Sequence, residues 1–127
     1  MSDVIQPVPI AIDKLLEQCV GSVKVAELVL KKLEEQLARD LKAIEASVSA
    51  GDAPSIARTA HALKGAAGAV AATALHAAAA SVEALAKSGT LDAAAADLAR
   101  LSEEAARCAQ YIPTARQSIA QGSASKT

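Results

Sequence analysis

A chain of 127 residues can hold one domain with a single core and is too short for two. Its net charge of −1 comes from mixed signs, and with one Tyr and no Phe or Trp it lacks the basic surface and stacking aromatics of a nucleic-acid-binding protein. The N-terminal segment lacks the basic and apolar blocks of a signal peptide, and no uncharged run is apolar enough to span a bilayer. We therefore expect a cytoplasmic protein without membrane contact. Cys19 and Cys108 have no metal-ligand spacing, so we expect two reduced thiols.

Helix-forming residues dominate the sequence. Ala makes up about a quarter of it, and no segment alternates β-branched and polar residues as a strand would, so we expect an all-α fold. In chain order, the elements begin with an extended lead-in over residues 1–9 and a short amphipathic helix over residues 10–20. A long helix is predicted over residues 23–50, with Ser22 capping its start and Gly51 closing its end.

Three further helices follow, joined by connections of two to five residues. Such short connections favour an antiparallel up-down-up-down four-helix bundle with a short additional N-terminal helix, forming one domain over residues 10–113. Because this core closes within one chain, we expect a monomer. The predicted bounds are about 52–70, then 73–88, then from Thr90 or Asp92 to Pro113, which ends or kinks the last helix, with a helix end and disordered tail over 114–127.

The long helix is expected to turn one apolar stripe inward and a charged face to water. The charged face includes Glu27, Glu35, Arg39 and Asp40, which are spaced for ion pairs along the helix surface. The expected apolar stripe, interrupted only at Lys32, consists of Val25, Leu28, Val29, Leu33, Leu37, Leu41, Ile44 and Val48.

The helix over residues 52–70 carries the most informative pattern. At 100° per residue, an apolar stripe falls within roughly 40° of one line, and His61 lies about 140° away from it, facing water. Lys64, Gly65 and Gly68 share the outward side with His61. The stripe consists of Ile56, Ala60, Leu63, Ala67 and Val70.

Two glycines inside this helix need an explanation. Each costs roughly 0.8 to 1 kcal/mol relative to Ala, which the chain uses almost everywhere else. Small residues there would allow a partner to approach the backbone beside His61 closely. We therefore predict a docking surface formed by Ala57, Gly65, Gly68 and Ala72, although Gly68 could instead mark a helix end.

An exposed imidazole is a nucleophile that is available near neutral pH. Lys64, one turn along the same side, would favour the neutral ring and neutralise an anionic group attached to it, so the pair suits a phosphoryl acceptor. A metal site fits poorly because no second ligand accompanies His61 at ligand spacing, and a hydrolase fits poorly because the sequence has no nucleophile elbow. The alternative is a non-catalytic helical adaptor or dimerisation module in which His61 is incidental.

The segment A-H-A-L-K-G-A-A-G-A-V, residues 60–70, resembles the signature of histidine-containing phosphotransfer domains. The resemblance extends to I-D-K-L-L near the start, to G-D before the helix that bears His61, and to L-x-x-x-A-x-x-V-E ending at Glu83. It implies a phosphorelay carrier, not an enzyme, in which His61 accepts the phosphoryl group and Lys64 stabilises its charge. The implied partners are response-regulator receiver domains and a hybrid histidine kinase, and the receiver would supply Mg²⁺, so that the carrier needs no cofactor of its own. In the alternative, an adaptor would bind response regulators or dimerise without phosphotransfer.

Two residues depart from the pattern of that family, and three others have open roles. Ala71 stands where many members have Gly at the turn, and Leu30 stands where many have Phe. Glu83 matches a glutamate common in the family, but an ion-pair partner on the helix surface is an equally good interpretation. His76 is expected to be a surface residue, and Arg58 is expected to touch a docked receiver without acting on phosphate.

Overall fold

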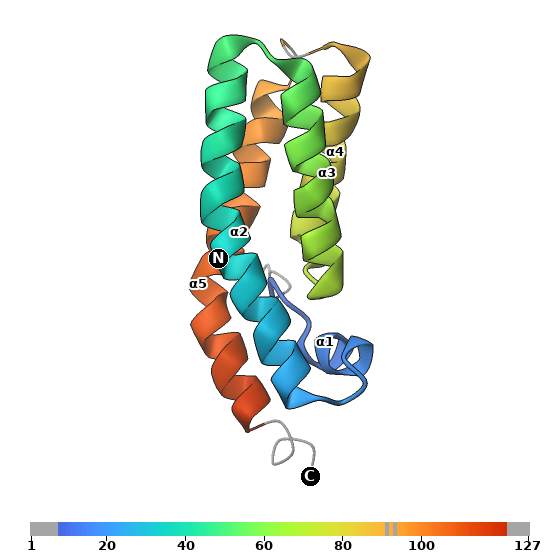
Figure 1. Ribbon diagram of the computed structural model, residues 1–127, viewed down its shortest axis with the longest axis vertical. Helices are drawn as coiled ribbons and strands as arrows, with labels where there is room; N and C mark the ends of the chain where they lie inside the picture. Colours follow the sequence, from blue (N-terminus) through green and yellow to red (C-terminus); the bar gives the residue numbers. More distant parts are fainter. Residues whose placement is uncertain (1–7, 91, 93, 122–127) are drawn as a thin grey trace, which may run out of the picture.

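The computed structural model describes residues 8–90, 92 and 94–121, so residues 1–7 of the predicted lead-in over 1–9 and residues 122–127 of the predicted tail lie outside the described residues. Within these ranges the chain is helical and contains no strand, which confirms the all-α prediction (Figure 1). None of these helices is both long enough and apolar enough to cross a membrane. The helices are α1 (Ile12–Gln18), α2 (Val23–Ala50), α3 (Ala53–Ala69), α4 (Thr73–Ser88) and α5 (Ala95–Ala120).

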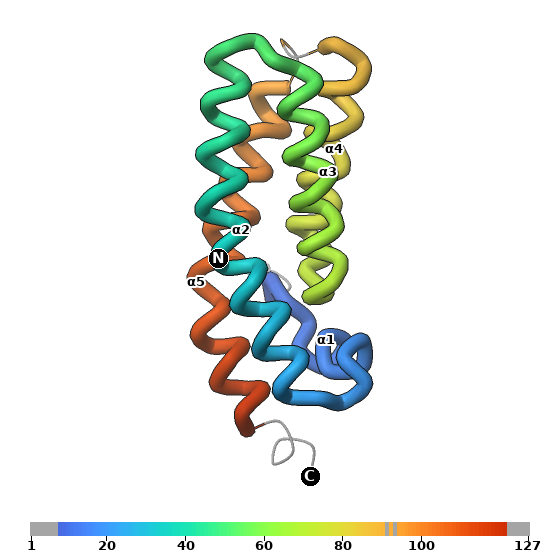
Figure 2. The backbone as a smooth tube through the Cα atoms, in the orientation of Figure 1, coloured from blue at the N-terminus to red at the C-terminus, as the bar shows by residue number. Residues whose placement is uncertain are grey.

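Four helices lie side by side around one core. Helix α3 packs against α2 and α4, and α5 packs against α2 and α4, so each long helix has two main neighbours. Figure 2 shows the α2–α3 and α3–α4 turns at opposite ends of α3. Helix α1 lies at the end where α3 finishes, beside the parts of α2 and α5 that extend beyond α3 and α4 (Figure 1).

Local capping explains where the helices begin and end. The Val25 amide donates a hydrogen bond to Ser22 Oγ at 3.1 Å, and the Ser55 amide donates to Asp52 Oδ1 at 3.2 Å, as expected for side chains that satisfy free N–H groups at helix starts. Gly51 ends α2 with a φ of 67°, a left-handed conformation that glycine adopts at little cost. The predicted bounds of α2 are therefore correct at both ends.

The inward face of α2 differs from the prediction. The buried positions are spaced three or four residues apart, as one helix face requires, and Asp40 falls in this line. Val25, Leu28 and Val48, expected to be inward, are exposed. Apolar residues occupy two adjacent lines of this helix, and their chemical type does not say which line meets the other helices. The buried residues are Ala26, Leu30, Leu33, Leu37, Asp40 and Ile44.

Helix α5 continues past Pro113 to Ala120. Pro113 was expected either to end or to kink this helix, and the first of these expectations is wrong. A proline in a helix loses one N–H donor and crowds the carbonyl four residues earlier, here that of Ala109. Both Ala109 and Pro113 are exposed, so water can satisfy the freed carbonyl, while Ile112 and Ile119 stay buried and hold the helix on the core. The helix begins at Ala95, later than predicted.

Candidate functional site

His61 lies near the middle of α3 and faces the neighbouring helix α4. Its side chain is 68% exposed, yet Nδ1 lies 2.9 Å from Glu83 Oε2. Glu83 projects from α4 and is only 5% exposed. One ring nitrogen is therefore held by a buried carboxylate, while most of the ring remains accessible to solvent.

Two lysines approach the same carboxylate. Lys64 Nζ lies 2.9 Å from Oε1, and Lys87 Nζ, one turn beyond Glu83 on α4, lies 2.9 Å from Oε2. Hydrogen bonds from Lys64, then Lys87, and a smaller one from His61 outweigh the opposing effect of desolvation. They lower the pKa of Glu83 from 4.5 to about 2. At neutral pH Glu83 is therefore a carboxylate anion.

The ionised state of Glu83 determines the tautomer of the histidine. A carboxylate can only accept hydrogen bonds, so Nδ1 of His61 must carry the hydrogen that it donates to Oε2. In the neutral ring the other nitrogen, Nε2, then has a free lone pair. The site thus presents Nε2 as a nucleophile, with a negative charge behind the ring.

The residues predicted to form the docking surface differ in their exposure. Gly65 and Gly68 are exposed, and a Cβ atom placed on Gly65 would meet nothing within 4 Å. A Cβ on Gly68 would lie 3.5 Å from Cδ2 of His76, an ordinary contact. Ala57 is nearly buried but lines an open hollow together with His61.

Ala72 does not lie on this surface, so its assignment to the docking surface is wrong. It is fully buried and precedes α4, where no partner can reach its side chain. The reason is the preceding residue, because Ala71 has a φ of 58°, a left-handed conformation that turns the chain inward between α3 and α4. This is the position where the sequence departs from the glycine expected at the turn.

Helix α1 holds the end of α3 in place. Nε2 of Gln18 donates hydrogen bonds to the carbonyl oxygens of Gly68 and Ala69, both at 3.1 Å. These are carbonyls that the last turn of a helix leaves without an intrahelical partner. The Ala11 amide also donates to the Ala71 carbonyl at 3.2 Å. The short N-terminal helix therefore supports the helix that carries His61.

Sequence reasoning identified the histidine but not all of its surroundings. Glu83 is an ion-pair partner, as one interpretation held, but it is buried and not on the surface. The sequence does not indicate a role for Lys87, which contacts Glu83. Arg58 lines the hollow beside His61, a position that its angle on the helix does not predict. His76 is exposed, as expected. The available signal was that His61 and Glu83 lie at similar distances from the α3–α4 turn, and an antiparallel helix pair would place them at one level.

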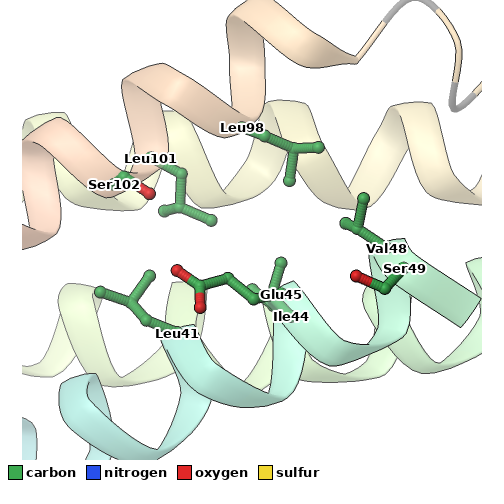
Figure 3. A pocket seen from close by; sticks show the side chains of 8 residues that line it. All are labelled: Leu41, Ile44, Glu45, Val48, Ser49, Leu98, Leu101 and Ser102. Atoms are coloured by element: carbon green, nitrogen blue, oxygen red, sulfur yellow. The ribbon is translucent and has the colours of Figure 1, made fainter.

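A second hollow, of about 270 Å³, lies between α2 and α5. Figure 3 shows apolar side chains from both helices facing into it, together with two hydroxyl groups and the carboxylate of Glu45. Its lining contains no cation that would attract a phosphoryl group. It is lined by Leu41, Ile44, Glu45, Val48, Ser49, Leu98, Leu101 and Ser102.

The fold and the site together define a class of protein: a helical bundle that presents a nucleophilic imidazole on its surface. The family model for the Hpt domain matches residues 28–118 of this chain, so the chain belongs to the Hpt domain family, whose members are phosphotransfer carriers and neither kinases nor phosphatases. The crystal structure of histidine-containing phosphotransfer protein B from Pseudomonas aeruginosa PAO1 is similar, with a TM-score of 0.79 and 22% sequence identity over 88% of this chain and 97% of that one. No curated protein matches the sequence significantly.

Proposed function

We propose that this protein accepts a phosphoryl group on Nε2 of His61 from the aspartyl phosphate of one receiver domain and passes it to the aspartate of another. The observation that carries the proposal is the 2.9 Å contact between Nδ1 and the buried Glu83 carboxylate in a side chain that is otherwise mostly exposed. The proposed carrier is a monomeric up-down-up-down bundle, and its partners include the receiver domain of a hybrid histidine kinase.

The proposed transfer step needs no further reacting group from this chain. The Nε2 lone pair attacks phosphorus, the N–P bond forms, and the P–O bond to the receiver breaks, with its electron pair leaving on the aspartate carboxylate. The ring keeps its hydrogen on Nδ1 and gains a positive charge, which faces Glu83. A carboxylate in this position stabilises the cationic ring in the way that the buried aspartate of a Ser-His-Asp triad does. Onward transfer reverses these steps with a second receiver aspartate.

The surface around the ring supports close approach by a receiver. Gly65 offers open space above the backbone, and Gly68 lies in ordinary contact range of a single side chain. In-line transfer requires the receiver aspartate to reach Nε2 directly, and misplacement by about 1 Å costs up to roughly 10²-fold in rate. We propose that Ala57, Gly65 and Gly68 form the docking surface, that Lys64 helps to stabilise the charge of the phosphoryl group, and that the receiver supplies Mg²⁺.

A labelling experiment tests the proposal. The full chain, H61Q and H76Q are each incubated with a phosphorylated receiver domain, and the protein-bound label is measured after acid and after base. We expect wild type and H76Q to take up an acid-labile, base-stable label and H61Q to take up none. The H76Q variant is a matched control because His76 is the other of the two histidines in the chain. An unlabelled wild type would instead favour an adaptor without phosphotransfer, and equal labelling of H61Q would refute His61 as the phosphoryl acceptor.

A further inference from the structure

The Glu83 carboxylate is approached by more positive charge than it can neutralise. It contacts the ammonium groups of Lys64 and Lys87, each at 2.9 Å, and the Nδ1–H of His61 at the same distance. Two ammonium groups facing one carboxylate leave an excess positive charge beside a neutral imidazole. Arg58 adds another cation nearby, with Nη2 donating a hydrogen bond to Ser55 Oγ at 2.9 Å.

The two lysines differ in their surroundings. Lys87 is 65% exposed and lines an open hollow of about 420 Å³ together with Ala57, Arg58, His61 and Glu83. Lys64 is half-buried and does not line this hollow. An exposed ammonium on a flexible four-carbon stem can change partners at little cost, whereas a partly buried one is more restricted. Lys87 is therefore the cation that is free to move.

Phosphorylation would change the charges on both sides of the ring. A phosphoryl group adds about −1.5 to −2 charges near neutral pH and three strong acceptor oxygens. At the same time the ring becomes positive while its Nδ1–H still faces Glu83. The cationic ring can then replace Lys87 as the partner of Oε2, so releasing Lys87 does not leave the buried carboxylate short of positive charge.

We propose that Lys87 exchanges partners when His61 is phosphorylated: its ammonium group moves from Glu83 Oε2 to the phosphoryl group on Nε2. The new contact lies beside the hollow that Lys87 lines together with Ala57 and Arg58. The proposal rests on the proposed function of His61 and adds a second residue that stabilises the phosphorylated state. Lys87 contacts the phosphoryl group directly, while Lys64 stays on Oε1 and stabilises the phosphoryl charge from one turn along α3. The exchange also stabilises the phosphorylated protein relative to the free one, because the charge of Lys87 then faces a group with more negative charge than Glu83.

The test uses the full chain and phosphoramidate, a small donor that phosphorylates histidine without a receiver. Wild type, K87M, K87R and K42M are labelled, and the phosphoryl group is titrated by ³¹P NMR. Lys42 is an exposed lysine on α2, which makes K42M the matched control. We expect the second phosphoryl pKa to rise by roughly 0.5 in K87M, as for a lost surface ion pair, and to remain at the wild-type value in K87R and K42M.

Each outcome separates the two proposals. A K87M phosphohistidine that titrates as wild type does, in a variant with unchanged helicity by circular dichroism, overturns the exchange and leaves the carrier function standing. A wild type that forms no phosphohistidine with either phosphoramidate or a phosphorylated receiver overturns the carrier function and the exchange with it. If K87M loses helicity, the polar variant K87Q replaces it: a raised phosphoryl pKa in folded K87Q supports the exchange, and the wild-type pKa overturns it.

Discussion

Replacing Gly65 separates what this position costs in stability from what it contributes to docking. In G65A the added methyl group meets nothing within 4 Å, so neither strain nor burial opposes the gain in helix propensity. The expected gain in the free energy of unfolding is about 0.8 to 1 kcal/mol, the difference between Gly and Ala inside a helix. For a chain of 127 residues this raises the melting temperature by about 3 to 5 °C, measurable by calorimetry.

A larger side chain at the same position tests docking directly. G65L keeps a good helix former and should be at least as stable as wild type, but its side chain stands where the receiver must approach. We expect transfer from a phosphorylated receiver to slow by about 10- to 100-fold, while labelling by phosphoramidate changes by less than about two-fold. The matched control is A106L, which adds an exposed leucine to α5, a helix that does not carry the docking surface.

Three results would refute this reasoning. A lower melting temperature for G65A would mean that the glycine is needed by the fold itself. Unchanged receiver-dependent transfer in G65L would mean that no partner comes close to the backbone at this position. Slow labelling of G65L by phosphoramidate as well would place the effect on the imidazole and not on docking.

Three further predictions concern other parts of the chain. The pKa of Glu83 falls from 4.5 to about 2 in the folded protein, so its contribution to stability is complete above pH 4.5 and disappears as the pH falls towards 2. The stability of E83Q should therefore lack the part of the pH dependence that Glu83 causes between these values. Identical acid unfolding of E83Q and wild type would contradict the lowered pKa of Glu83. Val20 is 91% exposed with a φ of 57°, so V20G should raise the free energy of unfolding by about 0.5 to 1 kcal/mol, whereas V25G, inside α2, should lower it by about 1 kcal/mol; denaturant titration measures both. Burial raises the pKa of Cys108 to about 11, so in a C19S background its thiol should react with Ellman's reagent only on unfolding, and rapid reaction of the folded protein would show that it is accessible.

The helices were largely predictable because their signals are local. The Ser22 and Gly51 caps lie within a few residues of the bounds they set, and the structure places α2 between them. The inward line of α2 was not predictable in the same way, because it depends on neighbours that a single helix does not contain. Asp40 illustrates the limit, since a charged residue between apolar ones reads as surface. It is nevertheless buried, where it accepts a hydrogen bond from Gln36 at 3.0 Å.

The candidate site shows the same difference between features set within one helix and features set by a neighbouring helix. His61, Lys64 and Gly65 lie on one helix, so their shared outward side follows from the helical period alone. The role of Glu83 depends on the packing of α4 against α3, and the residue spacing within either helix does not predict that packing. The prediction for Ala72 is wrong for a related reason. Helical periodicity places Ala72 beside His61 only if α3 continues that far, whereas α3 ends at Ala69 and the left-handed Ala71 redirects the chain.

The position of Glu83 links the stability of the bundle to the chemistry of its surface. A carboxylate with so little exposure is costly unless hydrogen bonds and positive charges compensate it, and here two lysines and the imidazole do so. The same contacts that make the carboxylate tolerable keep it ionised, and its ionisation keeps the hydrogen on Nδ1 and the lone pair on Nε2. Neutralising Glu83 would therefore remove the negative charge that fixes the tautomer of the ring and leave Lys64 and Lys87 close together without their shared anion. A carrier whose partner supplies the remaining catalytic groups needs little else from its own chain: a ring with a defined tautomer, a nearby excess of positive charge and space for the receiver.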